Sequence, residues 1–253
     1  MRYKPYILLV IICCLASCKQ QKTADSIKTP ANKETEAFLY EHLVREPLEP
    51  TANPALLILL HGYGSQEKDL YSFVDHLDPK LLVVCPRAPI SLTNDKYCWY
   101  QLNTTSANLR YKPDEVIQVS KDLVLYTQQL INHFKADKNK VFLGGFSQGA
   151  ILSLGTALNH STLFDGAICL SGQLYPEFMS SVTKNSIEDG LDLFISHGKQ
   201  DQVLPISTIE KNIKELKEKG IEPSYFTYDS GHTITAENFM DMLNWLNKQL
   251  SKS

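Results

Sequence analysis

Apolar runs of about strand length recur along the chain between residues 55 and 228. They are continuous rather than alternating, which is typical of strands that are buried on both faces of a parallel sheet. Segments with a helical spacing of apolar residues lie between or after them. The runs are Ala55–Leu60, Leu81–Cys85, Val141–Gly144, Gly166–Leu170, Leu191–Ser196 and Ser224–Tyr228.

The helical pattern is clearest from Asp114 to Phe134, where two apolar series with a spacing of seven residues give the whole segment one hydrophobic face. Further helices are expected at 67–76, 148–158, 206–219 and 236–250. This alternation predicts an α/β fold with a doubly wound and mostly parallel sheet flanked by helices. Ligands of such folds bind at the carboxyl ends of the strands.

Three segments depart from this alternation. Phe38–Arg45 has short apolar alternation and is expected to form an edge strand. Residues 88–112 are long, irregular and rich in Asn, Thr, Tyr and Trp, which is typical of functional loops. The connection from Ser171 to Gly190 is too short for a helical cap domain, so the sequence predicts an open site.

The N-terminus is typical of a targeting segment. Residues 1–17 are expected to form a signal peptide, because two basic residues precede an apolar run that is too short for a comfortable membrane span. The four residues that end in Cys18 resemble the lipobox of bacterial lipoproteins, in which this cysteine is acylated. Residues 18–36 are polar and predict a flexible tether, followed by one folded α/β domain at 37–253. We therefore expect a bacterial cell-envelope protein, anchored by lipid to a membrane and facing the periplasm or the cell exterior.

Composition and charge narrow the class further. With 253 residues and 43% hydrophobic content, the chain can bury one substantial core. The net charge of -3 is spread without a basic stripe, which argues against nucleic acid as a partner. Cys85 and Cys169 are expected to be small core residues. A disulfide between Cys85 and Cys98 is the alternative.

Ser147 is the candidate nucleophile. It lies in a G-x-S-x-G pattern between a predicted strand and a predicted helix, which is the context of a nucleophile elbow. Gly145 and Gly149 let strand and helix pass closely while the serine oxygen points outward. A serine hydroxyl is a weak nucleophile and needs a base, normally histidine, whose tautomer is fixed by an acid.

The base and the acid are expected in loops that follow later strands. His232 follows Gly231 after the last strand and is last in the order Ser, Asp, His, so we expect it to be the base. Asp201 lies in the loop after the preceding strand and is the favoured acid, with Asp229 as the alternative. His197 is expected to shape the loop that carries Asp201, and the alternative is that it is itself the base.

The remaining site residues are expected from two further loops. The backbone N–H groups of Gln148, at a helix N-terminus, and of Tyr63, in the loop after the first long strand, are the candidate oxyanion-hole donors. Trp99 and Tyr100 are expected to wall the acyl or alcohol pocket. The alternative for Trp99 is that it anchors its loop to the core.

Four motifs together resemble the phospholipase/carboxylesterase family of α/β-hydrolases, which includes the acyl-protein thioesterases. The resemblance spans Ala55–Leu250 and implies a triad of the matching serine, aspartate and histidine, in hydrolases of carboxylic esters or thioesters that use no cofactor. The first loop has HGYGS where the thioesterases have HGLGD, and the sequence Tyr-Cys-Trp-Tyr at 97–100 is closer to a bacterial carboxylesterase branch. The motifs are Leu60-His61-Gly62-Tyr63-Gly64, Gly145-Phe146-Ser147-Gln148-Gly149, His197-Gly198-x-x-Asp201-x-Val203-x-Pro205 and Gly231-His232.

The sequence therefore predicts a lipid-anchored serine carboxylesterase that hydrolyses short to medium acyl esters, thioesters or lysophospholipids through an acyl-enzyme. Two alternatives stay open, a serine peptidase of the same fold and a binding lipoprotein without catalysis. No cluster of His, Cys and Asp has the spacing of a metal site, so neither a metal nor another cofactor is expected.

Overall fold

The computed structural model describes residues 37–105, 108–182 and 190–252. The predicted signal peptide, Cys18 and the predicted tether lie outside the described residues. Within the described part of the chain, no helix is both long and apolar enough to span a membrane.

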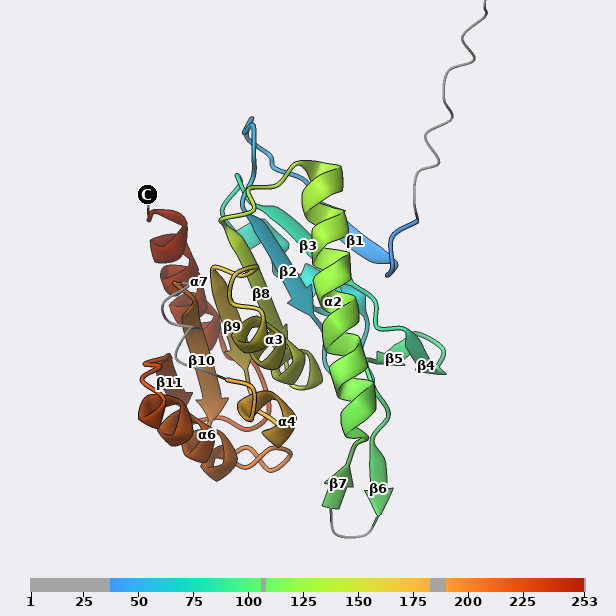
Figure 1. Cartoon of the computed structure of the whole chain (residues 1–253), viewed down its shortest axis with the longest axis vertical. Coiled ribbons are helices and arrows are strands. Elements are labelled where there is room, and N and C mark those ends of the chain that lie inside the picture. Colours follow the sequence, from blue (N-terminus) through green and yellow to red (C-terminus); the bar gives the residue numbers. More distant parts are fainter. Residues whose placement is uncertain (1–36, 106–107, 183–189, 253) are drawn as a thin grey trace, which may run out of the picture. The chain divides into compact units, whose positions relative to one another are not determined.

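A seven-stranded sheet forms the centre of the domain (Figure 1). Its order is β1-β3-β2-β8-β9-β10-β11, and all neighbours are parallel except β1, which pairs antiparallel with β3 at one edge. The predicted α/β fold and edge strand are thus confirmed. The strands are β1 His42–Arg45, β2 Leu56–Leu60, β3 Leu82–Pro86, β8 Val141–Phe146, β9 Gly166–Leu170, β10 Asp192–Gly198 and β11 Ser224–Tyr228.

Helices cover both faces of this sheet, which explains why its strands are apolar without alternation. In β2, Leu56, Ile58 and Leu60 belong to the core on one face, whereas Leu57 and Leu59 belong to the core on the other. The first core is covered by α2, α3, α4 and α6, and the second by α1, η1 and α7. These elements are α1 Glu67–Tyr71, η1 Val74–His76, α2 Pro113–Phe134, α3 Gln148–Asn159, α4 Pro176–Met179, α6 Ile206–Glu218 and α7 Ala236–Leu250.

Two predicted segments differ from the structure. The helix expected at 67–76 is divided into α1 and η1, and the hydroxyl of Ser72 donates a hydrogen bond of 2.6 Å to the Asp69 carbonyl where the first helix ends. Such a local bond competes with the helical pattern. Residues 88–112 are not irregular throughout, because they contain two antiparallel hairpins. These pair β4 Ile90–Thr93 with β5 Lys96–Cys98, and β6 Asn103–Thr105 with β7 Asn108–Arg110.

The three cysteines of the described chain are free thiols in the core. Cys85, Cys98 and Cys169 are all fully buried, and Cys85 is not paired with Cys98. Burial raises the pKa of Cys98 to about 11 and that of Cys169 to about 12. These thiols are therefore protonated and act as small apolar side chains near neutral pH.

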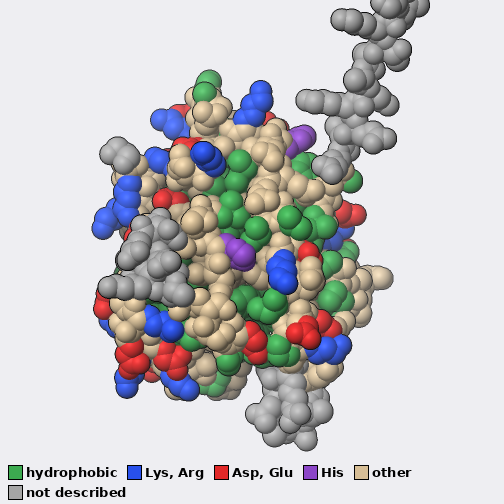
Figure 2. Space-filling model, in the orientation of Figure 1, with side chains coloured by type: hydrophobic (Ala, Val, Ile, Leu, Met, Phe, Trp, Pro, Cys, Tyr) green, Lys and Arg blue, Asp and Glu red, His purple; other side chains and the backbone are tan. Residues whose placement is uncertain are grey.

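The surface carries both signs of charge. On the face drawn in Figure 2, acidic and basic side chains are interspersed, and neither forms an extended area of its own. This face therefore offers no stripe of one charge.

Candidate active site

A sharp turn between β8 and α3 presents Ser147. The strand ends at Phe146 and the helix begins at Gln148, so the serine alone makes the connection. Its backbone has φ 53° and ψ -116°, a conformation that residues other than glycine rarely adopt. The resulting backbone strain is of the order of 1–3 kcal/mol. The serine N–H donates to the carbonyl of Leu170 at 2.9 Å, which holds the turn against β9.

Two glycines allow the strand and the helix to lie this close. A Cβ added to Gly145 would lie 2.6 Å from the backbone carbon of Gly149, and a Cβ added to Gly149 would lie 2.1 Å from the carbonyl oxygen of Leu60. Real Cβ atoms essentially never approach backbone atoms this closely. The G-x-S-x-G spacing is thus required by packing as well as by the turn.

The structure brings Ser147, His232 and Asp201 together in one chain of hydrogen bonds. His232 Nε2 lies 2.8 Å from Ser147 Oγ, and His232 Nδ1 lies 2.6 Å from Asp201 Oδ2. A carboxylate only accepts, so Nδ1 carries the proton and Nε2 is free to accept from the serine hydroxyl. This is the arrangement in which a histidine can remove a proton from serine.

Asp201 is held rigidly for this contact. Its side chain is fully buried, and Oδ1 accepts from the backbone N–H groups of Val203 at 2.8 Å and Leu204 at 2.9 Å. His197 Nε2 lies 2.7 Å from the carbonyl of Leu204 and 3.2 Å from Asp201 Oδ2. Since both neighbours accept, Nε2 of His197 carries the proton. His197 thus stabilises the loop around Asp201, in the shaping role predicted for it, and is not the histidine in contact with Ser147.

Asp229, the alternative acid, points elsewhere. Its carboxylate pairs with Lys199 at 2.9 Å, and both side chains are exposed. The imidazole of His232 is therefore bonded to Asp201 and not to Asp229.

The two expected oxyanion donors lie beside the serine. Tyr63 and Gln148 both line a cavity together with Ser147 and His232. Gly62 is close enough that an added Cβ would lie 3.4 Å from the Cβ of Ser147. No hydrogen bond from the backbone N–H of Tyr63 or Gln148 to another group occurs within the described residues. Both amides are therefore available to a ligand.

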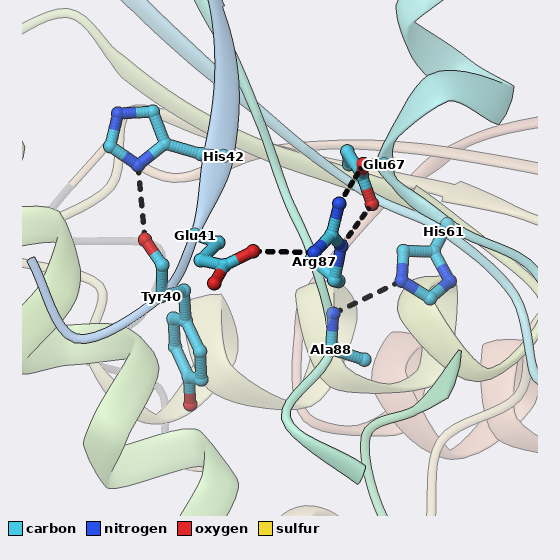
Figure 3. Close-up of polar contacts among 7 residues, drawn as sticks. All are labelled: Tyr40, Glu41, His42, His61, Glu67, Arg87 and Ala88. Carbon is cyan, nitrogen blue, oxygen red and sulfur yellow. Dashed lines mark hydrogen bonds and ion pairs between the residues drawn. The ribbon is translucent and has the colours of Figure 1, made fainter. Parts of the chain in front are cut away.

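The imidazole of His61 fixes the loop that carries Tyr63. His61 is buried, and its Nε2 accepts from the N–H of Ala88 at 3.1 Å (Figure 3). Its Nδ1 lies 2.8 Å from the carbonyl oxygen of Gly62. Because Nε2 faces a donor, Nδ1 carries the proton and donates to Gly62. Burial lowers the pKa of His61 from its ordinary 6.5, so the ring is neutral at pH 7.

An ion pair holds the other end of the same loop. Glu67, the first residue of α1, is buried and receives two hydrogen bonds from Arg87, 2.7 Å from Nε and 2.6 Å from the terminal nitrogen (Figure 3). The guanidinium holds the pKa of Glu67 below its usual range. Arg87 also pairs with Glu41 and lies 5.0 Å from the ring centre of Tyr97. Residues 61–67 are thus attached at both ends to the neighbouring residues Arg87 and Ala88.

The side chain of Gln148 has a structural role that the sequence analysis missed. Its Oε1 accepts from the N–H of Trp99 at 2.9 Å, and its Nε2 donates to the carbonyl of Tyr100 at 2.9 Å. The indole N–H of Trp99 donates to the carbonyl of His61 at 2.9 Å. The signal in the sequence was a glutamine, able both to donate and to accept, directly after the candidate nucleophile.

A cavity of about 490 Å³ opens over Ser147. Tyr100 lines it, as expected, whereas Trp99 is fully buried behind it and is not part of its wall. The structure therefore favours the anchoring role for Trp99. The other lining residues include apolar side chains from several elements, namely Leu102, Phe146, Ile151, Tyr175, Val203 and Leu204.

No metal site accompanies this cavity in the described part of the chain. Within residues 37–105, 108–182 and 190–252, no group of three or more His, Cys, Asp or Glu side chains is arranged to hold a metal ion.

Comparison with known proteins finds a matching family model and similar sequences and structures. The family model described as phospholipase/carboxylesterase matches residues 42–250. Acyl-protein thioesterase 1 homolog 1 of Dictyostelium discoideum is 26% identical over 215 residues, which cover 81% of this chain and 94% of the relative. The solved Bacillus cereus carboxylesterase is 19% identical with a TM-score of 0.68, covering 83% of this chain and 95% of its own. The solved Zea mays acyl-protein thioesterase 2 is 21% identical with a TM-score of 0.63, and the match covers 84% of this chain and 100% of that one.

The close approach of Gly149 to β2 can be tested by adding one methyl group. Gly149→Ala should lower the free energy of unfolding by about 3 kcal/mol, the upper range for an overpacked core, because the new Cβ meets a backbone oxygen that has little room to move. Gly231→Ala is the control, since its Cβ would meet nothing nearer than 3.8 Å. Urea denaturation of both variants measures the difference, and equal stabilities would contradict the packing described.

Proposed function

The chain belongs to the phospholipase/carboxylesterase family, and from this premise we propose that it cleaves carboxylic esters with Ser147, His232 and Asp201 as a catalytic triad. As a member of this family it is a serine hydrolase that acts on ester bonds. The observation that carries the assignment of residues is the pair of contacts of His232, 2.8 Å to the serine oxygen and 2.6 Å to the aspartate.

In the proposed reaction, Ser147 Oγ attacks the ester carbonyl while His232 Nε2 takes its proton. Asp201 keeps the imidazole in the required tautomer and stabilises the imidazolium that forms. The imidazolium then gives its proton to the leaving alcohol. Water, activated by the same histidine, releases the acid from the acyl-enzyme.

The negative charge of the tetrahedral intermediate needs donors in fixed positions. The amides of Tyr63 and Gln148 are our candidates, because both line the cavity and neither is bonded within the described chain. Removal of one such donor typically raises the barrier by about 2.7–4 kcal/mol. Gln148 also begins α3, whose N-terminus favours negative charge.

His61 is the residue that aims the Tyr63 amide. In a trans peptide the carbonyl and the following N–H point in opposite directions. The described chain has no cis peptide bond, and His61 holds the Gly62 carbonyl at 2.8 Å. The N–H of Tyr63 is therefore directed away from the imidazole. The hydrogen bond from His61 sets this direction before substrate binds.

The cavity supports short to medium acyl groups. Its volume of about 490 Å³ suits a small ligand, and its wall is mostly apolar. Thioesters of similar size, and lysophospholipids, fit the same chemistry. We further propose, from the sequence alone, that the enzyme is held by lipid on Cys18 at the bacterial cell envelope.

A series of p-nitrophenyl esters from acetate to palmitate tests the proposed function. Turnover by the domain at 37–253 should be highest for the short and medium chains, because a cavity of about 490 Å³ has the size of a small-ligand site. Ser147→Ala should lower kcat by about 10⁶-fold, since the triad acts as a unit. Activity that survives this change would contradict the assignment of the nucleophile. Turnover of peptides without turnover of esters would instead favour a peptidase.

Two substitutions of His61 test its role in positioning. In His61→Asn the amide nitrogen replaces Nδ1 and still donates to Gly62, whereas in His61→Gln the amide lies at the place of Nε2 and still reaches Ala88. We expect kcat to fall by about 10²-fold in the Gln variant, as for a lost oxyanion donor, and by much less in the Asn variant, with little change in KM.

Thermal unfolding of both His61 variants separates this effect from stability. Leu246→Ala, a buried change in α7 far along the chain from the loop, serves as a destabilised control with kcat unaltered. Equal values of kcat for the Asn and Gln variants would contradict the positioning role.

A further inference from the structure

A second cavity adjoins the catalytic one. Its volume is about 380 Å³, and it shares Ser65 and Asp69 with the cavity over Ser147. The two cavities therefore meet at the loop that carries Tyr63 and at the start of α1. The full lining of the second cavity is Gly64, Ser65, Gln66, Lys68, Asp69, Ser72, Asp95 and Lys96.

The lining of this second cavity, which we call the polar cavity, differs in chemistry from that of the first. All its lining residues except Gly64 carry a polar side chain. Its two lysines and two aspartates balance in charge. The cavity therefore offers strong donors and strong acceptors without a net charge. Hydroxyl groups both donate and accept, and they match such a mixture better than a single ion does.

The walls of the polar cavity are fixed by the backbone. The N–H of Gly64 donates to the carbonyl of Tyr97 at 2.8 Å, and the N–H of Tyr97 donates to the carbonyl of Ser65 at 2.8 Å. These bonds join the loop to the hairpin of β4 and β5, and Arg87 holds Glu67 at the start of α1. Gly64 has φ +73° with open space around it, so the loop leaves room for a ligand.

Several polar groups of this cavity are free to bind a ligand. Within the described residues, the side chains of Lys68, Asp95 and Lys96 take part in no hydrogen bond or ion pair with the protein. Asp69 Oδ2 accepts from the hydroxyl of Ser65 at 2.8 Å, which leaves Oδ1 of the same carboxylate to accept from a ligand. Most of the lining is exposed, so a product bound here can leave directly to solvent.

We infer that the polar cavity binds the alcohol half of the substrate, and that this alcohol is uncharged and rich in hydroxyl groups, as in a glycoside or glycerol. The inference rests on the proposed function. Ser147 Oγ forms the new bond to the acyl carbon, the bond from that carbon to the alkoxy oxygen breaks, and His232 returns the proton to this oxygen. The apolar cavity keeps the acyl group in the acyl-enzyme, while the open polar cavity holds the half that departs.

Esters with one acyl group and different alcohols test this inference on the full chain. Ethyl butyrate, glycerol monobutyrate and methyl 6-O-butyrylglucoside form the same butyryl-enzyme and differ only in the departing half. We expect kcat/KM to be about tenfold higher or more for the two hydroxylated esters than for ethyl butyrate. The reason is that their hydroxyl groups can form hydrogen bonds to the charged side chains of the polar cavity, and such bonds are stronger than neutral ones. The double variant Asp95→Ala/Lys96→Ala should remove this preference, because kcat/KM for the two hydroxylated esters falls toward the value for ethyl butyrate.

The controls separate the alcohol site from the reaction itself. Lys138→Ala, an exposed lysine outside the polar cavity, should keep the wild-type preference. Turnover of ethyl butyrate that disappears in Ser147→Ala supports the proposed function independently. Equal kcat/KM for all three esters would overturn the alcohol site alone. So would an equal preference for ethyl 4-hydroxybutyrate over ethyl butyrate, because its hydroxyl lies in the acyl half. No turnover of any ester would overturn both.

Discussion

The turn at Ser147 is the constraint on which the rest of the site depends. The residue is forced to φ 53° because β8 and α3 pass each other with only glycines at their closest point. That close approach puts the serine oxygen at the carboxyl end of the sheet and the N–H of Gln148 at a helix N-terminus. The strain is local, and the buried strands on both sides of β8 support it. A looser turn would misplace the candidate nucleophile and one candidate oxyanion donor together.

Buried histidines support the two loops that face this turn. His61 fixes the loop after β2 by bonding to Gly62 and Ala88, and His197 fixes the loop after β10 by bonding to Leu204 beside Asp201. In each case the ring presents one N–H to a backbone carbonyl, which gives a buried polar ring a hydrogen-bond partner. His232 differs because it is partly exposed and spans from serine to aspartate. In the proposed mechanism, positioning and proton transfer are thus divided among different histidines.

The sheet and the elbow could be predicted from the sequence because their signals are local. Continuous apolar runs mark strands covered on both faces, and G-x-S-x-G marks a turn whose packing requires glycine. What was missed depends on contacts between distant residues. Gln148 meets Trp99 and Tyr100 across 49 and 48 positions, and His61 meets Ala88 across 27. Trp99 could equally have lined the pocket, and only the fold places its indole N–H against a carbonyl in the core.

Labelling with a fluorophosphonate tests the central claim, that this turn presents an activated serine, most directly. The reagent phosphonylates a serine whose proton is removed by an adjacent base, and digestion with mass spectrometry locates the adduct. We expect one adduct, on the peptide that contains Ser147, and much slower labelling when His232 is replaced by alanine. A folded sample that stays unlabelled, or an adduct on a different serine, would contradict it.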